Sequence, residues 1–450
     1  MTASIQATRI SGTAPLAVLF DSTATTTTTS GVDTFRQISY AYNFGDDRGL
    51  NWAVSGQPKN TQTGGPISAH IFDVAGTYTV KVRATDATGA YSDASVTVTV
   101  ANPDTFYATT KTICVSPASN FTGCPSGATQ QTSLPSAWNG KRVLLHRGES
   151  FGDISIQDGN SAVQVGAYGT GAKPIVASVG VGSWRPATSA FATDITVMDL
   201  NVKNGMQQSL GSKVLFYRND VHVATGSGNI AMSLGQEDYW YRGDPYRVVP
   251  QSAFYNAREI FFVENYAVGA DTSSSMGIWG SGSRVAFMGN TFGKQQMHSV
   301  RFSALNKGFL AHNEIQGISA DGIRHALKLH SMGLNAYADG FINDTSGVGG
   351  WASSQIVIAN NLFGNAADNN AWTVAISPQN DQYAEGVENV LVENNRFVRG
   401  TNTSTDLVLG GRNLTYRGNT VVGGTSISEG VGHTGALPAS WLGPYYSSAK

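Results

Sequence analysis

The sequence predicts an all-β protein, with an N-terminal immunoglobulin-like β-sandwich followed by a right-handed parallel β-helix solenoid. Three observations support this fold class. A short apolar phrase with an Asn recurs between residues 213 and 424, and residues 1–102 alternate apolar and polar positions between turn-rich connections. The composition is rich in glycine and poor in charge, with 52 Gly and 13% charged residues. Many tight turns and long shared strands account for such a composition.

Residues 1–102 are predicted to form the sandwich. Apolar and polar residues alternate in TYTVKVRATD (77–86) and SVTVTVA (95–101), which is the pattern of antiparallel strands with one covered face. The order of phrases also resembles the polycystic kidney disease (PKD) domain. The phrases are SGTAPLAVLFDST (11–23), YAYNFGDD (40–47) and HIFDVAGTYTVKVRATDATGAYSD (70–93), with Tyr42, Asn43 and Asp47 where the family more often has Trp, Asp and Gly.

The PKD resemblance implies an accessory module. Such modules act as spacers or as weak binders of carbohydrate or protein, so we expect a unit that folds on its own and is dispensable for chemistry. Residues 101–106 (ANPDTF) are the expected short polar linker.

Residues 103–137 are predicted to form a linker and lead-in loop. They hold the only two cysteines, Cys114 and Cys124, in a stretch rich in Ser, Pro, Asn and Gly. Because no second cysteine pair or nearby histidine offers metal ligands, the pair predicts a disulfide rather than a metal or redox site.

The solenoid is predicted over residues 138–430, with a C-terminal tail at 431–450. Each copy of the repeated phrase has an apolar stretch, one or two polar or small residues, an Asn and another apolar residue, as in IFFVENYAV (260–268) and VAFMGNTF (285–292). One strand pair cannot bury its own apolar face, so successive coils must stack. The repeated residues are Asn219, Asn265, Asn290, Asn313, Asn361, Asn395 and Asn419.

These Asn residues predict an internal ladder. An Asn at the same corner of each coil can hydrogen-bond the Asn above and below, and Asn tolerates a left-handed turn. We therefore expect a structural role for them rather than a catalytic one. His312, beside the ladder, is likewise expected to be a polar turn residue.

The start of the solenoid resembles that of pectate-lyase-like polysaccharide lyases and related carbohydrate-active proteins. The phrases WNGKRVLLHRGESFGDISI (138–156) and VQVGAYGTGAKPIV (163–176) carry the likeness, which extends over about residues 106–430. The resemblance implies the fold, but lyases, hydrolases, epimerases and tailspikes all share that fold. For the lyases it implies a Lys or Arg base, and Ca²⁺ as a candidate ion that neutralises the substrate carboxylate.

The overall charge limits the classes of binding partner that the protein is expected to have. A formal net charge of −2 gives no field that would attract nucleic acid or an anionic membrane, and no apolar run approaches the roughly 20 residues of a membrane span. The opening MTASIQATRI lacks the basic and apolar regions of a secretion signal. We expect a secreted protein whose signal is absent from this sequence, or a virion-surface protein, monomeric unless it is a trimeric tailspike.

A basic face is the candidate site. In MHSVRFS (297–303), GIRHALKLHS (322–331) and MGIWGSG (276–282), alternate apolar residues fill the core and the residues between them point outward. Spacings of 22 and 27 residues, one coil each, bring Trp279, Arg301 and Lys328 together. Stacked cations repel one another unless an anion lies among them. The other residues assigned to this face are His298, Arg324, His325 and His330.

The loop QEDYWYRGDPYR (236–247) is the second candidate binding element. Aromatic rings stack on the apolar faces of sugars, and Arg side chains bind carboxylates or sulfates through paired donors. Its predicted substrate contacts are Trp240, Tyr241 and Arg242, and Tyr239 is a candidate for proton transfer. The alternative is a hydrophobic cap folded over the coils.

This cationic site predicts β-elimination on an anionic, uronic-acid-containing polysaccharide of the alginate, pectate or glycosaminoglycan kind. Cations neutralise the C6 carboxylate, a base removes the C5 proton and an acid protonates the leaving oxygen. Neighbouring cations favour the uncharged form of an amine, so Lys328 is the expected base, with Arg301 as the neutralising cation. His330 and Tyr239 are the candidates for the other proton transfers.

Two alternatives stay open. A glycoside hydrolase needs two carboxyl groups on either side of the scissile bond, and the available acids are Asp321, Glu237, Asp238 and Asp271. The other alternative is a non-catalytic carbohydrate-binding adhesin or phage tailspike segment.

Overall fold

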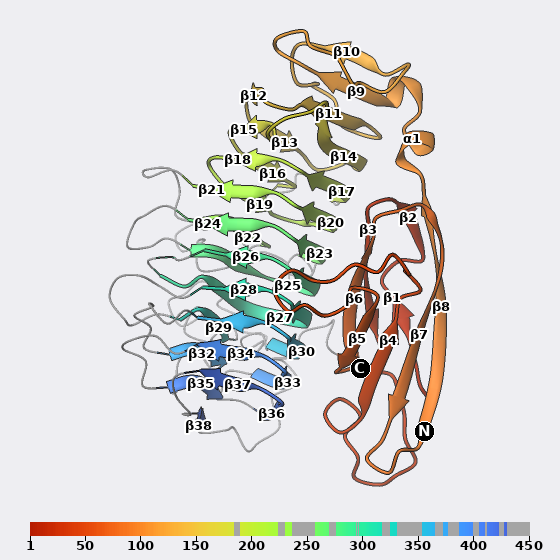
Figure 1. Cartoon of the computed structure of the whole chain (residues 1–450), viewed down its shortest axis with the longest axis vertical. Helices are drawn as coiled ribbons and strands as arrows, with labels where there is room; N and C mark the ends of the chain where they lie inside the picture. The colour runs from red at the N-terminus through yellow and green to blue at the C-terminus, as the bar shows by residue number, and fades with distance from the viewer. Residues whose placement is uncertain are drawn as a thin grey trace, which may run out of the picture.

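The computed structural model describes residues 1–183, 190–223, 230–235, 257–269, 276–293, 295, 297–316, 325–330, 353–364, 372–376, 387–398, 405–409, 412–422 and 427–429. Apart from helix α1 (Pro103–Phe106) and the 3₁₀ turn η1 (Thr109–Lys111), the elements of these residues are strands. A sandwich and a right-handed parallel β-helix lie side by side (Figure 1). The predicted fold class is confirmed.

The sandwich consists of two packed sheets. Three strands form the smaller sheet: β1 (Gln6–Ala7), β3 (Leu16–Asp21) and β6 (Ile67–Phe72). The larger sheet has the order β2 (Ser11–Thr13), β8 (Tyr91–Ala101), β7 (Gly76–Thr85), β4 (Ser39–Asn43) and β5 (Thr61–Gly64). Alternate residues of β4 are buried and exposed, as the sequence pattern predicts. Tyr42 is buried among them, and its hydroxyl donates to the Pro66 carbonyl oxygen at 2.7 Å.

Each coil of the solenoid contributes one strand to each of three faces. The first-face strands are β11 (Arg142–His146), β14 (Ser161–Tyr168), β17 (Ala192–Met198), β20 (Gly211–Tyr217), β23 (Ala257–Val263), the C-terminal parts of β25 (Met276–Met288) and β27 (Val300–Ala311), β30 (Ser353–Ala359), β33 (Val387–Glu393) and β36 (Arg412–Arg417). The strands β25 and β27 are long because each continues from the third face into the first.

The other two faces follow the same parallel stacking. The second-face strands are β12 (Ser150–Phe151), β15 (Ile175–Val176), β18 (Asn201–Val202), β21 (Asp220–His222), β24 (Tyr266–Val268), β26 (Thr291–Phe292), β28 (Glu314–Ile315), β31 (Leu362–Phe363), β34 (Arg396–Val398) and β37 (Thr420–Val422). The third-face strands are β13 (Ile154–Ile156), β16 (Val179–Val181), β19 (Met206–Gln208), β22 (Ile230–Leu234), the N-terminal parts of β25 and β27, β29 (Leu327–His330), β32 (Trp372–Ile376), β35 (Thr405–Leu409) and β38 (Ile427–Glu429).

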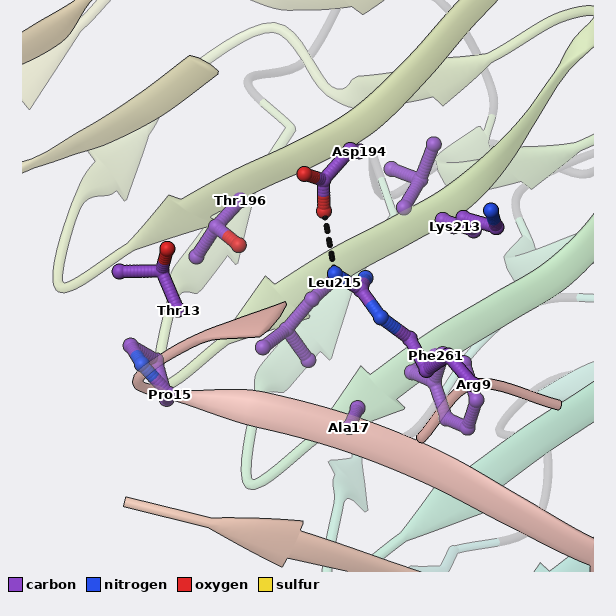
Figure 2. A pocket seen from close by; sticks show the side chains of 10 residues that line it. Arg9, Thr13, Pro15, Ala17, Asp194, Thr196, Lys213, Leu215 and Phe261 are labelled. Atoms are coloured by element: carbon purple, nitrogen blue, oxygen red, sulfur yellow. Dashed lines mark hydrogen bonds and ion pairs between the residues drawn. The ribbon is translucent and has the colours of Figure 1, made fainter. Parts of the chain in front are cut away.

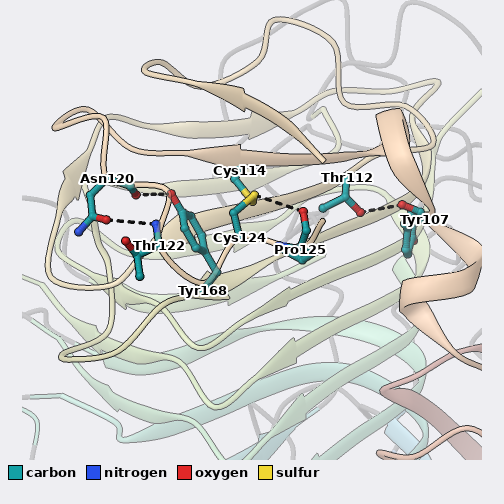
Figure 3. Close-up of a disulfide and its surroundings, with 8 residues drawn as sticks. All are labelled: Tyr107, Thr112, Cys114, Asn120, Thr122, Cys124, Pro125 and Tyr168. Atoms are coloured by element: carbon teal, nitrogen blue, oxygen red, sulfur yellow. Dashed lines mark hydrogen bonds between the residues drawn. A yellow bond between two sulfur atoms is a disulfide. The ribbon is translucent and has the colours of Figure 1, made fainter. Parts of the chain in front are cut away.

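The solenoid begins before the predicted boundary. Strands β9 (Thr112–Val115) and β10 (Thr129–Gln131) pair in parallel with each other, and β9 pairs with β11. The expected lead-in loop at 103–137 therefore already holds strands of the first coil. Cys114 and Cys124 form a disulfide there with an S–S length of 2.07 Å (Figure 3), as predicted. The Cys114 side chain is fully buried beside Leu144 and Tyr168.

The predicted Asn ladder is present as an unbroken chain of side-chain hydrogen bonds. The Nδ2-to-Oδ1 distances are 3.1 Å for Asn219 to Asn265, 3.0 Å for Asn265 to Asn290, 2.9 Å for Asn290 to Asn313, 2.9 Å for Asn313 to Asn361, 3.0 Å for Asn361 to Asn395 and 3.0 Å for Asn395 to Asn419. Each Nδ2 also donates to a backbone carbonyl, as Asn290 does to Phe262 at 2.8 Å. The ladder therefore satisfies buried polar groups along the corner.

The left-handed turn at this corner differs from the expectation. The residue with positive φ is the one before each ladder Asn, and the ladder Asn itself is not left-handed. The left-handed residues are Arg218, Glu264, Gly289, His312, Asn360, Asn394 and Gly418. A left-handed residue turns the chain, and the following Asn side chain then points into the corner.

The sandwich packs along the first face of the solenoid, and its independent folding stays a prediction. Both faces of β3 are buried: Val18 and Phe20 face the sandwich core, whereas Ala17 and Leu19 contact the solenoid. Strand β6 likewise lies against β27 and β30. This second buried face makes the sandwich part of the same folded body.

The solenoid strands at this contact are also buried on both sides. In β23, Ile260 and Phe262 fill the interior of the solenoid, whereas Phe261 and Val263 pack against the sandwich. The same division holds in β20, β25, β27 and β30. Adjacent apolar residues in these strands therefore serve two different cores.

Polar contacts fix the register of this interface. Lys307, only 3% exposed, forms an ion pair with Asp21 of the sandwich, and Lys59 forms one with Glu264. The His312 ring stacks on Trp52 with centroids 5.0 Å apart. His312 Nε2 lies 2.9 Å from the Gln62 amide oxygen.

Candidate functional site

The three predicted side chains of the basic face occupy one row on successive coils. Trp279 of β25 pairs with Arg301 of β27, and Arg301 pairs with Lys328 of β29. Strands in a sheet lie about 4.8 Å apart, so the row is compact. The residues before them, including Val300 and Leu327, are at most 1% exposed and fill the core. These strands are adjacent in Figure 1.

The charge in this row is local. Following the register, the described members on other coils are Ser155, Gly180, Gln207, Ser233, Ala375, Val408 and Ser428. None of these is charged, so within the described part of the row Arg301 and Lys328 are the charged residues. A ligand that needs cations would therefore bind at β27 and β29.

The Arg301 guanidinium is held by two neighbouring rings. Its Cζ lies 5.1 Å from the centroid of Trp279, and its Nε donates to His330 Nε2 at 3.0 Å. An imidazole nitrogen that accepts a hydrogen bond carries no proton, so His330 is neutral in this arrangement. His330 therefore adds no positive charge beside Arg301 and Lys328, and repulsion at this face is reduced.

Two of these residues are less accessible than the sequence suggests. Trp279 and His330 were expected to point outward, but they are only 6% and 4% exposed. The Arg301 side chain lies against the ring of each. Their geometry therefore suits holding Arg301 more than stacking on a sugar.

His298 and His325 pack on each other at the start of the same strands. Their rings stack with centroids 5.1 Å apart, and the His325 backbone N–H donates to His298 Nδ1 at 3.2 Å. Each residue is 4% exposed. Their predicted contact with substrate stays a prediction.

His312 has a structural environment, as expected, but its contacts differ from those that the sequence predicted. The sequence placed it in a turn, whereas the structure buries it at the contact with the sandwich. Burial lowers the pKa of His312 to about 3. The imidazole is therefore neutral, and its ring contacts Trp52 and Gln62 of the sandwich.

Several predicted residues lie outside the described residues. Among the site candidates these are Tyr239, Trp240, Tyr241, Arg242 and Arg324, and among the carboxylates of the hydrolase alternative they are Asp321, Glu237, Asp238 and Asp271. Their roles stay predictions.

The described ranges contain no set of side chains that matches the expected calcium site. Within them, no group of three or more His, Cys, Asp or Glu side chains could hold a metal ion. We therefore derive no catalytic step through a metal. The helices of the described ranges also include none that is long and apolar enough to cross a membrane.

A small cavity elsewhere in the molecule belongs to the domain contact. It lies between the sandwich and the first face, and its lining includes Arg9, Thr13, Asp194 and Lys213 (Figure 2). Arg9 Nη2 and Asp194 Oδ1 form an ion pair at 2.7 Å across it. This cavity is on a different face from the basic row and is a seam between two packed units.

Comparisons with known proteins identify the sandwich. Residues 13–100 match the PKD domain family, so the molecule is a parallel β-helix protein with a PKD domain packed on its side. No curated protein matches the sequence.

Two solved structures are similar to the chain. The family 28 exopolygalacturonase of Yersinia enterocolitica has 9% sequence identity and a TM-score of 0.39, covering 96% of this chain and 98% of its own. The A-module of the Azotobacter vinelandii mannuronan C-5 epimerase AlgE4 has 10% identity and a TM-score of 0.26, covering 68% and 84%.

Proposed function

We propose that the third face of the solenoid binds an anionic, uronic-acid-containing polysaccharide and cleaves it by β-elimination. The observation that carries this proposal is the register of Arg301 with Lys328 on adjacent coils, beside Trp279. It brings a guanidinium and an amine to one place.

Arg301 is the group that binds the C6 carboxylate. A guanidinium presents paired donors that match the two oxygens of a carboxylate. Withdrawing charge from the carboxylate makes the C5–H bond more acidic, because the carbanion formed on proton removal is stabilised. Contacts with Trp279 and His330 fix the guanidinium before the substrate arrives, which reduces the entropy lost on binding.

Lys328 is the base in this scheme. Its uncharged amine takes the C5 proton, and the electrons of the C5–H bond form a C4–C5 double bond as the C4–O bond breaks. The positive charge of Arg301 on the next coil favours the uncharged form of the amine. The leaving oxygen takes a proton from an acid, for which Tyr239 is the predicted residue.

A product assay tests this function. The full chain is incubated with alginate, pectate and a uronate-containing glycosaminoglycan, with a neutral glucan as the control. We expect new chain ends and the ultraviolet absorbance of the C4–C5 double bond from at least one uronate and nothing from the glucan.

The same assay separates the alternatives. New reducing ends without that absorbance would contradict β-elimination and favour a hydrolase. Binding of a uronate polymer without new ends would favour a carbohydrate-binding adhesin or tailspike segment.

A further inference from the structure

We propose that His330 is a positioning residue: its neutral imidazole holds the Arg301 guanidinium in the orientation that binds a carboxylate, and protonation of the ring at acidic pH releases it. The identity of the ligand as a uronate rests on the proposed function. The positioning of Arg301 rests on the structure alone.

The first argument is geometric. His330 stands opposite Ser303 of β27, two residues beyond Arg301, so the two side chains meet diagonally across neighbouring strands. Arg301 Nε donates to His330 Nε2 at 3.0 Å while Trp279 covers the guanidinium. With Nε bonded to the ring, a carboxylate is met by the two Nη nitrogens.

The second argument is that the imidazole is held in place. His330 is 4% exposed, and its carbonyl oxygen accepts a hydrogen bond from Ser353 Oγ at 2.6 Å. Ser353 belongs to β30 and also accepts the backbone N–H of Leu305 at 3.0 Å. The end of β29 is therefore anchored, and the ring has little room to turn away from Arg301.

The third argument is the charge around the ring. The charged groups in the described third-face parts of the surrounding strands are Arg301 on β27 and Lys328 on β29, and both are cationic; the described residues of β30 and β32 add none. Protonation of His330 would remove the lone pair that accepts from Arg301 and would add a third cation. The protonated ring therefore opposes the arrangement that the neutral ring supports.

This inference separates His330 from the proton transfers of the reaction. A nitrogen whose lone pair is bound to Arg301 Nε is poorly placed to take a substrate proton. His330 acts through Arg301, and so its removal should weaken uronate binding rather than abolish chemistry alone.

Ligand binding as a function of pH tests the inference. The protein carries Lys328→Ala, so that the ligand is not consumed, and the dissociation constant of a uronate oligosaccharide is measured between about pH 5 and pH 7.5. With His330 present, binding should weaken by a factor on the order of ten once the pH is low enough to protonate the buried ring, and the titration is continued to about pH 4 for that reason. His330→Gln keeps an acceptor that does not titrate, and should bind as at neutral pH across the range. His330→Phe, which fills the space without an acceptor, should bind weakly at every pH.

Equal binding by His330→Phe and the parent protein would overturn the inference, as would an acidic loss that persists unchanged in His330→Gln. A ligand-free measurement distinguishes this failure from failure of the proposed function. In the ¹⁵N spectrum of the histidine rings, assigned with His330→Gln, His330 should be neutral at neutral pH with its proton on Nδ1. A proton on Nε2 would overturn the inference; the expected tautomer in a protein that binds no uronate would instead contradict the proposed function.

Discussion

Each Asn of the ladder uses both ends of its amide. The oxygen accepts from the Asn of the preceding coil, and the nitrogen donates to the Asn of the next coil and to a backbone carbonyl. A residue that lacks the amide leaves several buried groups without partners. The recurring phrase was enough to predict this chain of contacts, because only one corner of each coil carries the Asn.

The ladder leads to a stability prediction. Asn290→Ala or Asn313→Ala should lower the free energy of unfolding by about 1–3 kcal/mol, since buried donors and acceptors lose their partners. Turnover per folded molecule should persist. Thermal or denaturant unfolding measures the effect, with the exposed Asn51→Ala as a control that should change stability by less than about 0.5 kcal/mol. Wild-type melting combined with lost turnover would contradict the structural role.

His312 predicts a pH dependence of stability. Burial lowers its folded-state pKa to about 3, below the value of about 6.5 for an unfolded chain. The unfolded state therefore binds the proton first as the pH falls from about 6.5 toward 3, and the free energy of unfolding decreases by up to about 1.4 kcal/mol per pH unit. Unfolding of the wild type and His312→Gln between about pH 4.5 and pH 7 measures this slope. Identical slopes would contradict the assignment.

Sequence patterns predicted where the site residues lie, but they did not predict which of these side chains contact one another. Alternation and coil spacing placed Trp279, Arg301 and Lys328 in one row, and the strand register agrees. The bond from Arg301 to His330 could not be predicted, because spacing does not say which ring nitrogen faces a neighbour. The low exposure of Trp279 could not be predicted either, because it depends on how side chains pack across coils.

At the scale of the strands, a missed feature was visible in the sequence. Segments such as IFFV (260–263) and VAFM (285–288) are apolar at consecutive positions. Alternation alone requires only one covered face, whereas consecutive apolar residues indicate two. The second face is the one that the sandwich covers, and which partner covers it depends on tertiary packing that a local pattern does not encode.

The shared interface predicts that the sandwich stabilises the solenoid. Phe261→Ala should lower the free energy of unfolding by about 3–5 kcal/mol, because it leaves a cavity between the two units. Phe106→Ala, at a residue that is 41% exposed, is the control and should have a small effect. Calorimetry measures both. A chain beginning at residue 104 that melted like the full-length protein would contradict this account.

The disulfide predicts a stabilised first coil. Reduction, or the double substitution Cys114→Ser with Cys124→Ser, should lower stability by about 2–4 kcal/mol, since the loop between the cysteines gains freedom in the unfolded chain. Melting measures the total effect, and limited proteolysis should find the new cleavage near residues 114–131. Unchanged stability after complete reduction would show that the first coil does not depend on this crosslink.

At the scale of the whole molecule, the sandwich and the candidate site lie on different faces of the same coils. Strands β25 and β27 carry Trp279 and Arg301 in their third-face parts, and residues such as Ala286 and Phe309 pack against the sandwich in their first-face parts. The sandwich therefore braces the coils that carry the site from the first face, and its contacts do not include the row of the site. Sequence patterns predicted both units and the row of the site; their lateral packing followed only from the structure.

The most direct test of the account is the turnover of Lys328→Ala and Arg301→Ala on the uronate polymer that the wild type cleaves. Each should lower kcat by about 10²–10⁴ with little change in melting temperature. The charge-matched controls are Lys81→Ala, at an exposed position of the sandwich, and Arg396→Ala, at an exposed position of the second face, and both should keep wild-type turnover. Wild-type turnover in Lys328→Ala, especially if Asp321→Ala is inactive, would contradict β-elimination at this face.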